Sequence, residues 1–211
     1  MRIEFADSVP STQKVLVEGL RNGEIQPPFA LVAKEQTQGI GSRNNTWSGL
    51  EGNLFFSFCM SETALPADLK GESASIYFSM IMREVLAAHG SQIWLKWPND
   101  FYVGDKKIGG TLTTRVGEIY VCGMGINLKN APENAGILDI DVSPSAVVGE
   151  FCKRLQTAPS WAEIFKKFES EFEKSREFIT HVEGEEVALK DTKLLSDGSL
   201  DINGRRVFSL R

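Results

Sequence analysis

The chain has 211 residues, of which 42% are hydrophobic and 24% are charged, and its formal net charge is −5. That length is sufficient for one ordinary domain with a sizeable core and a small appendage. The acidic balance argues against a nucleic-acid-binding protein, which normally carries a basic patch, and no apolar run approaches the roughly 18 residues of a membrane span.

The cysteines and the N-terminal residues indicate a cellular compartment. Cys59, Cys122 and Cys152 are odd in number and form no CxxC pair, which predicts neither a disulfide framework nor a zinc site. Residues 1–7 lack the apolar core of a secretory signal peptide. We therefore expect a cytoplasmic protein with reduced thiols.

The first fifty residues predict a strand, a helix, a second strand and a long loop. Residues 2–7 and 29–33 have the composition of strands, and Ser11 or Thr12 can cap the helix that lies between them. Capping alone explains both hydroxyl residues without any ligand. Residues 36–53 are rich in Gly, Asn and Ser, so they predict a loop of the length found in lids and binding loops.

Several common catalytic motifs are absent from the sequence. Gly39 and Gly41 begin a dinucleotide-binding pattern, but Asn44 stands where the third glycine is needed and no helix pattern follows. The two histidines, His89 and His181, are far apart, and neither HExxH nor GxSxG occurs. His89 stands where a predicted helix ends, which favours a capping or surface role. We therefore reject a Rossmann site, and the missing signatures argue against a triad hydrolase.

The middle of the chain predicts a buried strand over 54–59 and a helix over 72–89, whose apolar residues recur at steps of three and four. Residues 93–95 predict another strand, and the segment KWPNDFYVGDKKIGG (96–110) follows it. Within this segment Gly104-Asp105 is suited to a two-residue hairpin turn whose first central residue has positive φ. The hairpin should place an aspartate and a lysine, at positions 100 and 107, on neighbouring backbone segments.

Residues 110–114 and 119–128 predict two more strands joined by a turn at 116–118. Gly123 and Gly125 weaken the second strand because glycine contributes no packing. Two explanations remain equally open at this point. Either a ligand needs close access to the backbone, or the strand contains a bulge or packs tightly against a neighbouring helix.

The last third predicts two helices followed by short strands. One helix begins at Pro144, and a second begins after Pro159 with an aromatic stripe that continues to Ile179. Beyond residue 183, Asp-Gly and Asn-Gly pairs at 197–198 and 203–204 predict hairpins. About thirty residues cannot hold a core alone, so we expect them to dock on the main domain. The predicted division is 1–182 and 183–211.

Three motifs occur in an order that resembles the biotin protein ligases. They are Gly39-x-Gly41 followed by Arg43 and Trp47, KWPND at 96–100 with KIGG at 107–110, and GMGIN at 123–127. The second motif is highly specific for that family, and the resemblance extends over nearly the whole chain. It implies an α+β fold like that of class II synthetases: a mixed β-sheet flanked by helices forms the catalytic domain, and a small SH3-like β unit follows it.

The resemblance implies a ligase that uses ATP in two steps. Biotin and ATP first form biotinyl-5′-AMP, and the biotinyl group then passes to a lysine of a biotin carboxyl carrier protein domain. Lys107 is implied as the cation that stabilises charge when two anions meet in the first step, with Mg²⁺ on the departing pyrophosphate. Asp100 is implied as the carboxylate that orients or deprotonates the attacking amine.

Further ligand contacts are implied by positions within the family's motifs, and residues 36–53 are implied as a loop that orders over the adenylate. The biotin side comprises Ser11, Thr12, Gln36, Gly39, Ile40, Lys107, Gly110, Gly123 and Gly125. The ATP and adenylate side comprises Arg43, Trp47, Asn99, Asn127 and Arg211. No metal ligand is implied.

The loop departs from the family pattern, which reads GRGRRGR before the tryptophan. Over residues 39–45 this chain keeps one of the four arginines, Arg43. Contacts from arginine to phosphate or carboxylate are charge-assisted, so their loss should weaken the grip on the ligand. We expect a less tightly held adenylate than in arginine-rich members.

Family members that also repress transcription carry an N-terminal winged helix-turn-helix, whereas here the catalytic strand begins at residue 2. The resemblance therefore implies a monofunctional ligase with no nucleic-acid or membrane partner. A monomer and a homodimer through the sheet both stay open. The competing interpretations are a lipoate or octanoate ligase and a non-catalytic biotin-binding regulator. KWPND favours biotin over lipoate, and the presence of both Asp100 and Lys107 favours an enzyme.

Overall fold

The computed structural model describes residues 1–41, 47, 49, 51–182 and 184–208. Within these ranges no helix combines the length and the apolar character that a bilayer crossing requires. Cys59, Cys122 and Cys152 are buried free thiols, and burial raises the pKa of Cys59 and of Cys152 to about 11. All three side chains therefore contribute to packing.

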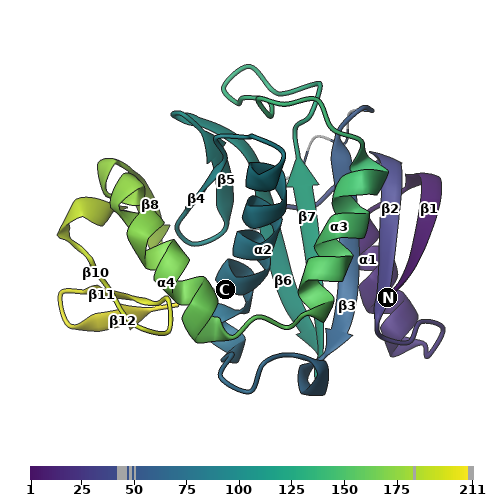
Figure 1. Ribbon diagram of the computed structural model, residues 1–211, viewed down its shortest axis with the longest axis horizontal. Coiled ribbons are helices and arrows are strands. Elements are labelled where there is room, and N and C mark those ends of the chain that lie inside the picture. The colour runs from purple at the N-terminus through teal and green to yellow at the C-terminus, as the bar shows by residue number, and fades with distance from the viewer. Residues whose placement is uncertain (42–46, 48, 50, 183, 209–211) are drawn as a thin grey trace.

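A seven-stranded mixed sheet forms the centre of the molecule, with strand order β1-β2-β3-β7-β6-β5-β4 (Figure 1). The first pair is parallel and the other neighbours are antiparallel. The strands are β1 (Arg2–Val9), β2 (Phe29–Gln36), β3 (Leu54–Ser61), β4 (Trp94–Lys96), β5 (Asp100–Val103), β6 (Lys106–Val116) and β7 (Ile119–Ile126). This mixed sheet confirms the α+β class predicted from the sequence.

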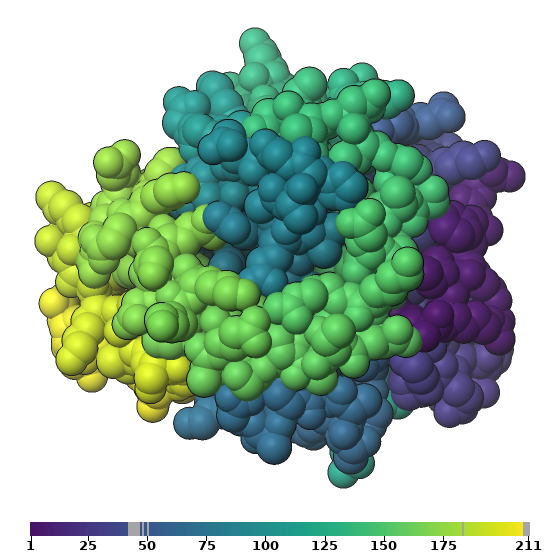
Figure 2. Space-filling model, in the orientation of Figure 1, coloured from purple at the N-terminus to yellow at the C-terminus, as the bar shows by residue number. Residues whose placement is uncertain are grey.

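Helices cover both faces of the sheet. They are α1 (Thr12–Arg21), α2 (Ala74–Ala88), α3 (Pro144–Gln156) and α4 (Trp161–Phe172). In Figure 1, α2 and α3 lie in front of the sheet and α1 lies behind it. Figure 2 shows that side chains of α2, α3 and α4 close over the front face, with the C-terminal segments against one flank.

Alternate residues of the central strands enter two separate cores. Phe56 and Phe58 of β3 pack against the helices of the front face, where Phe56 lies 5.4 Å from the ring of Phe151. Cys59 of β3 joins Leu16 of α1 in the smaller core behind. Because both faces are buried, β3 reads as a nearly continuous apolar run. The alternation puts Ser57 on the face that carries α1.

The C-terminal residues form a small β element. It consists of a pair, β8 (Ile179–Val182) with β9 (Glu185–Ala188), and a three-stranded sheet of β10 (Lys193–Leu194), β11 (Leu200–Ile202) and β12 (Arg205–Val207). The pair joins residues on both sides of the predicted boundary at 182/183, and the division into two domains stays a prediction.

Three buried donors attach this C-terminal element to the main domain. Trp97 Nε1 donates to Gly198 O at 2.8 Å, Trp161 Nε1 donates to Ser196 O at 2.9 Å, and Ser73 Oγ donates to Asp197 O at 2.7 Å. All three acceptors are backbone carbonyls of one turn. The predicted docking of the C-terminal segment therefore occurs, and it occurs beside the KWPND motif.

The prediction that the last helix continues to Ile179 is wrong. Helix α4 ends at Phe172, a 3₁₀ turn follows over 173–177, and Ile179 begins β8 with 47% of its surface exposed. The spacing of seven residues between Phe172 and Ile179 imitates a helical repeat. In the structure Phe178 instead packs on Trp94, at 5.4 Å between ring centroids, and this contact brings the chain alongside the sheet edge.

Candidate active site

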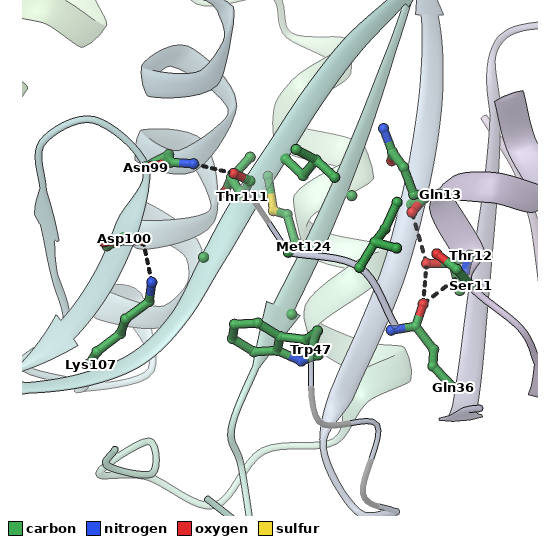
Figure 3. A pocket seen from close by; sticks show the side chains of 17 residues that line it. Ser11, Thr12, Gln13, Gln36, Trp47, Asn99, Asp100, Lys107, Thr111 and Met124 are labelled. Atoms are coloured by element: carbon green, nitrogen blue, oxygen red, sulfur yellow. Dashed lines mark hydrogen bonds and ion pairs between the residues drawn. The ribbon is translucent and has the colours of Figure 1, made fainter. Parts of the chain in front are cut away.

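A cavity of about 200 Å³ opens on the sheet face that carries α1 (Figure 3). Its lining comes from α1, from the ends of β2 and β5, from β3, β6 and β7, and from the loop after β2. The lining residues are Ser11, Thr12, Gln13, Gln36, Ile40, Gly41, Trp47, Ser57, Asn99, Asp100, Lys107, Gly110, Thr111, Leu112, Gly123, Met124 and Gly125. Two chemically different ends can be distinguished, which we call the amide end and the charged end.

The amide end is built where α1 meets β2 and β3. Gln36 Oε1 accepts from the backbone N–H of Thr12 at 2.8 Å and from its hydroxyl at 3.2 Å. The same hydroxyl lies 2.8 Å from Ser57 Oγ. Ser11 caps α1, since its Oγ accepts from Lys14 N at 3.5 Å, and it also lines the cavity. The predicted cap at Ser11 is confirmed.

Gln13 completes the amide end and was not predicted. Its Nε2 donates to Val121 O of β7 at 3.1 Å, and the residue is 5% exposed. Its Oε1 has no hydrogen-bond partner among the residues that the structure describes. Its place on the buried face of α1, three residues before Leu16, is a pattern that could have identified it.

Ser57 was also missed at the amide end. It is the one polar residue in the run Leu-Phe-Phe-Ser-Phe-Cys over 54–59, where a buried hydroxyl is unusual. That anomaly is visible in the sequence, but the strand alone does not show which face the hydroxyl occupies or what lies opposite it.

The charged end is formed by the hairpin of β5 and β6. Lys107 Nζ lies 2.6 Å from Asp100 Oδ1, with the lysine side chain 40% exposed and the aspartate 20%. Gly104 adopts a φ of +56° at the turn, as the sequence predicts, and the pairing shifts register between Phe101 and Tyr102. The shift pairs Tyr102 with Lys107 while Asp100 pairs with Gly110, and both charged side chains line the cavity.

Asn99 fixes the corner in front of Asp100. Its Nδ2 donates to the carbonyl of Thr111, and its own carbonyl accepts from Thr111 N at 2.9 Å. The corner is thus bonded to β6 in both directions. Figure 3 shows Asn99, Asp100 and Lys107 on one side of the cavity and Gln13, Thr12 and Gln36 on the other, with Trp47 and Met124 between them.

Contacts outside the cavity hold the hairpin in place. The buried carboxylate of Glu171 accepts from Leu95 N at 3.1 Å and pairs with Arg83 at 2.8 Å, which satisfies an N–H of edge strand β4. Ser175 Oγ accepts from Trp97 N at 3.2 Å. The KWPND strand is therefore supported by α4 and by the turn after it.

The two strand glycines are explained by close side-chain contacts on the cavity wall. A Cβ at Gly123 would lie 2.7 Å from Gln13 Oε1 and 3.0 Å from Ser57 Oγ. A Cβ at Gly125 would lie 2.7 Å from the indole ring of Trp47. Strand β7 pairs with both neighbours without a register shift, so the bulge explanation is wrong. Tight packing and cavity access are both present at these positions.

The predicted site residues that remain to be placed are Gly39, Arg43, Trp47, Asn127 and Arg211. Trp47 N donates to Gly39 O at 2.9 Å, which closes the loop beside the cavity, although Gly39 itself does not line it. Asn127 is buried away from the lining, and its Nδ2 donates to Gly136 O at 3.1 Å. Arg43 and Arg211 lie outside the described residues. The ligand contacts of all five positions stay predictions.

Comparison with known proteins gives the following likenesses. The model of the Biotin/lipoate A/B protein ligase family matches residues 5–129. The Bifunctional ligase/repressor BirA of Bacillus spizizenii is 28% identical over 184 residues, which cover 84% of this chain and 54% of that protein. This chain spans about half the length of the curated relatives that it matches first.

Two solved structures are similar over almost their full length. Biotin acetyl coenzyme A carboxylase synthetase from Helicobacter pylori, with bound biotinylated ATP, is 40% identical with a TM-score of 0.93, covering 98% of this chain and 99% of that one. Biotin protein ligase from Aquifex aeolicus, in complex with biotin and ATP, is 25% identical with a TM-score of 0.79, covering 100% and 98%.

Proposed function

The chain belongs to the biotin/lipoate A/B protein ligase family, among the biotin protein ligases, and on this premise we propose that it joins biotin to a lysine of a carrier protein at the expense of ATP. The observation that carries the proposal is one cavity with an aspartate–lysine pair at one end and converging amide and hydroxyl groups at the other. The charged end suits reaction at a carboxylate, and the amide end suits a polar, uncharged ring.

In the first step the carboxylate oxygen of biotin attacks the α-phosphorus of ATP, and pyrophosphate departs. Two anions must approach each other, and charge accumulates on the phosphoryl oxygens. Lys107 is a partly exposed cation at the cavity, and it can move its ammonium group from Asp100 to those oxygens. Such fixed charge stabilises the transition state more than the separated reactants.

In the second step the lysine amine of the carrier attacks the acyl carbon of biotinyl-5′-AMP. The bond between that carbon and the phosphate oxygen breaks, and AMP leaves with its electrons. The amine must lose a proton as the amide bond forms. Asp100 becomes free to accept it when Lys107 turns to the phosphate, because the two are paired in the ligand-free structure. The exposed position of the pair lets a carrier lysine reach it.

The adenylate is a mixed anhydride that water hydrolyses, so the cavity must exclude solvent between the steps. Trp47 contributes to this, because its ring lies directly on Gly125 in the cavity wall. Its Nε1 is buried without a partner within the described residues, and an acceptor on the ligand would satisfy it. We assign Trp47 to the nucleotide side of the cavity.

Mg²⁺ is proposed as part of the substrate, carried on the ATP phosphates. The described residues contain no group of three or more His, Cys, Asp or Glu that could hold a metal ion. Asp100 is the carboxylate among the cavity-lining residues. Mg²⁺ commonly binds through phosphates, waters and one or two carboxylates, so this donor set fits the ion when ATP brings it.

Incubation with biotin, ATP and a purified biotin carboxyl carrier domain tests the proposal. We expect mass spectrometry to show one biotinyl group on a single carrier lysine, dependent on ATP, with lipoate and octanoate giving far less product in parallel reactions. Modification by lipoate or octanoate but not by biotin would overturn the biotin assignment. The cytoplasmic location remains a prediction from the sequence, and the choice between monomer and homodimer stays open.

Adenylate retention gives a second measurement. The loop before Trp47 keeps Arg43 alone of the family's four arginines, so we propose faster release of biotinyl-5′-AMP than in arginine-rich members. A filter-binding time course with labelled biotin measures the release directly. Very slow release would contradict this part of the proposal.

A further inference from the structure

The hydrogen bonds at the amide end determine which cavity groups are donors and which are acceptors. The side-chain atom of Gln13 that faces Val121 O must be its nitrogen, because a carbonyl can only accept. The other atom, Oε1, is therefore an acceptor, and it is buried without a partner among the described residues. This assignment follows from chemistry and not from a choice of amide orientation.

Three further side chains, those of Gln36, Thr12 and Ser57, form a hydrogen-bonded series with fixed donors and acceptors. Gln36 presents its oxygen to Thr12 N, so Thr12 Oγ1 must donate its own proton to that oxygen. Thr12 then has no proton left for Ser57, and Ser57 Oγ must donate across their 2.8 Å contact. Ser57 thus shows only lone pairs to the cavity, while the amide nitrogen of Gln36 remains a donor.

Oε1 of Gln13 and Oγ of Ser57 lie together above Gly123, since a Cβ at that glycine would approach both within 3.0 Å. Gln13, Ser57 and Gly123 all line the cavity, and a side chain at Gly123 would occupy the space beside the two acceptors. Gln36 lies at the same end of the cavity (Figure 3), and its amide nitrogen is a donor there. A ligand that fits this end must carry its own N–H or O–H toward Gln13 and a carbonyl toward Gln36.

We propose that Gln13 is a specificity-determining residue, whose Oε1 accepts a hydrogen bond from a ring N–H of the substrate. The inference rests on the proposed function and deepens it. The cyclic urea of biotin supplies both N–H donors and a carbonyl acceptor. The dithiolane of lipoate and the chain of octanoate supply no N–H, and either would leave a buried acceptor unpaired. Sites built for a hydrogen bond reject analogues that lack the donor.

The test compares wild type, Gln13→Met and the exposed control Gln156→Met in calorimetric binding to biotin without ATP. Methionine keeps the length of the side chain and removes the acceptor. We expect Gln13→Met to bind biotin about tenfold to a hundredfold more weakly and the control to match wild type. In steady-state pyrophosphate release, KM for biotin should rise by the same factor while kcat changes little.

Two biotin analogues separate a direct contact from a structural effect. In each, one ureido N–H is replaced by oxygen to give a cyclic carbamate. Wild type should bind one of the two carbamates about tenfold or more weakly than it binds biotin. Gln13→Met should bind that carbamate and biotin with equal affinity. An equal loss of affinity from biotin to the carbamate in both proteins would overturn the inference. This holds even if the variant folds poorly, because the two ligands are compared on the same protein.

The same preparations distinguish failure of this inference from failure of the proposed function. Wild-type protein that binds biotin, with Gln13→Met binding it equally well, overturns the role of Gln13 and leaves the ligase proposal intact. Wild-type protein that binds no biotin overturns the proposed function and the inference with it. If the ratio of biotin affinity to lipoate affinity is at least tenfold smaller in Gln13→Met than in wild type, the result supports both the role of Gln13 and the proposed function.

Discussion

The two ends of the cavity differ in how the fold supports them. The amide end lies on central strands β3 and β7 and on α1, and its polar side chains are buried and bonded to one another. The charged end lies on a hairpin next to the sheet edge, and its ion pair is partly exposed. In the proposed reaction the neutral ring of biotin needs donors and acceptors at fixed positions, whereas the Asp100–Lys107 pair must be reached in turn by ATP and by the carrier protein.

The exposed position of the hairpin requires support from elsewhere in the chain. Strand β4 is an edge, yet its N–H at Leu95 is satisfied by Glu171 of α4 and the indole of Trp97 is bonded to the C-terminal turn. The rigidity of the charged end is therefore supplied by residues 76 and 101 positions further along the chain, while the amide end is rigid through its own contacts.

Lys107→Ala is the strongest test of the charged end. It removes the cation proposed to stabilise the first transition state, so pyrophosphate release should fall by about 10² to 10³-fold. Biotin affinity at the amide end should change far less. The matched control is Lys106→Ala, an exposed neighbour that does not line the cavity. Wild-type turnover in Lys107→Ala would remove the basis of the assignment.

Asp100→Asn should separate the two chemical steps. The variant keeps the shape of the side chain but cannot accept the amine proton, so transfer to the carrier should fall by about a hundredfold. Adenylate formation should continue, and biotinyl-5′-AMP should accumulate on the enzyme. Quenched-flow measurement of both steps checks this, and equal loss of both would show that Asp100 acts before transfer.

Gly123→Ala tests the amide end. The added Cβ would collide with Gln13 and Ser57, so biotin KM should rise by about tenfold with little change in kcat. Gly149→Ala on α3 is the control, because a Cβ there meets nothing within 4 Å. An unchanged biotin KM in Gly123→Ala would mean that the ligand does not approach this wall.

Trp97→Phe tests the support behind the charged end. It leaves Gly198 O buried without its donor, and the free energy of unfolding should fall by about 1–3 kcal/mol. Trp161→Phe removes a similar bond, to Ser196 O, from a tryptophan that is not part of the motif. Urea denaturation should show comparable losses in the free energy of unfolding for the two variants. Only Trp97→Phe should also slow biotin transfer to the carrier severalfold. Equal effects of both substitutions on transfer would mean that the bond between Trp97 and the C-terminal turn does not support the charged end.

The smallest effect concerns acid stability of that turn. Burial raises the pKa of Asp197, but hydrogen bonds from Ser199 and the ion pair with Arg206 outweigh it, so the pKa lies below its ordinary value of 3.8. A lowered carboxyl pKa stabilises the fold above the ordinary value, and the contribution is lost as pH falls through the lowered one. Asp197→Asn should flatten the fall in stability below about pH 4. An unchanged pH dependence would contradict this.

Local chemistry in the sequence predicted most of the elements and the charged end. The hairpin at Gly104 is a short-range feature, and a turn of two residues is enough to bring Asp100 and Lys107 onto adjacent strands. The end of the helix at Phe172 was missed because the same spacing of apolar residues fits two structures. One is a continuous helix, and the other is a helix followed by a 3₁₀ turn.

What the sequence by itself determined is therefore the set of strands and helices, the pairing of Asp100 with Lys107 and the family motifs, since these depend on neighbours within a few residues. Only the tertiary structure decided that Gln13 lies against Gly123, that Ser57 faces α1, and that Trp97 is bonded to a turn 101 residues away. These contacts join segments whose relative placement depends on sheet order and on which face α1 crosses. A pattern of apolar residues marks a face as buried, but it does not name the partner.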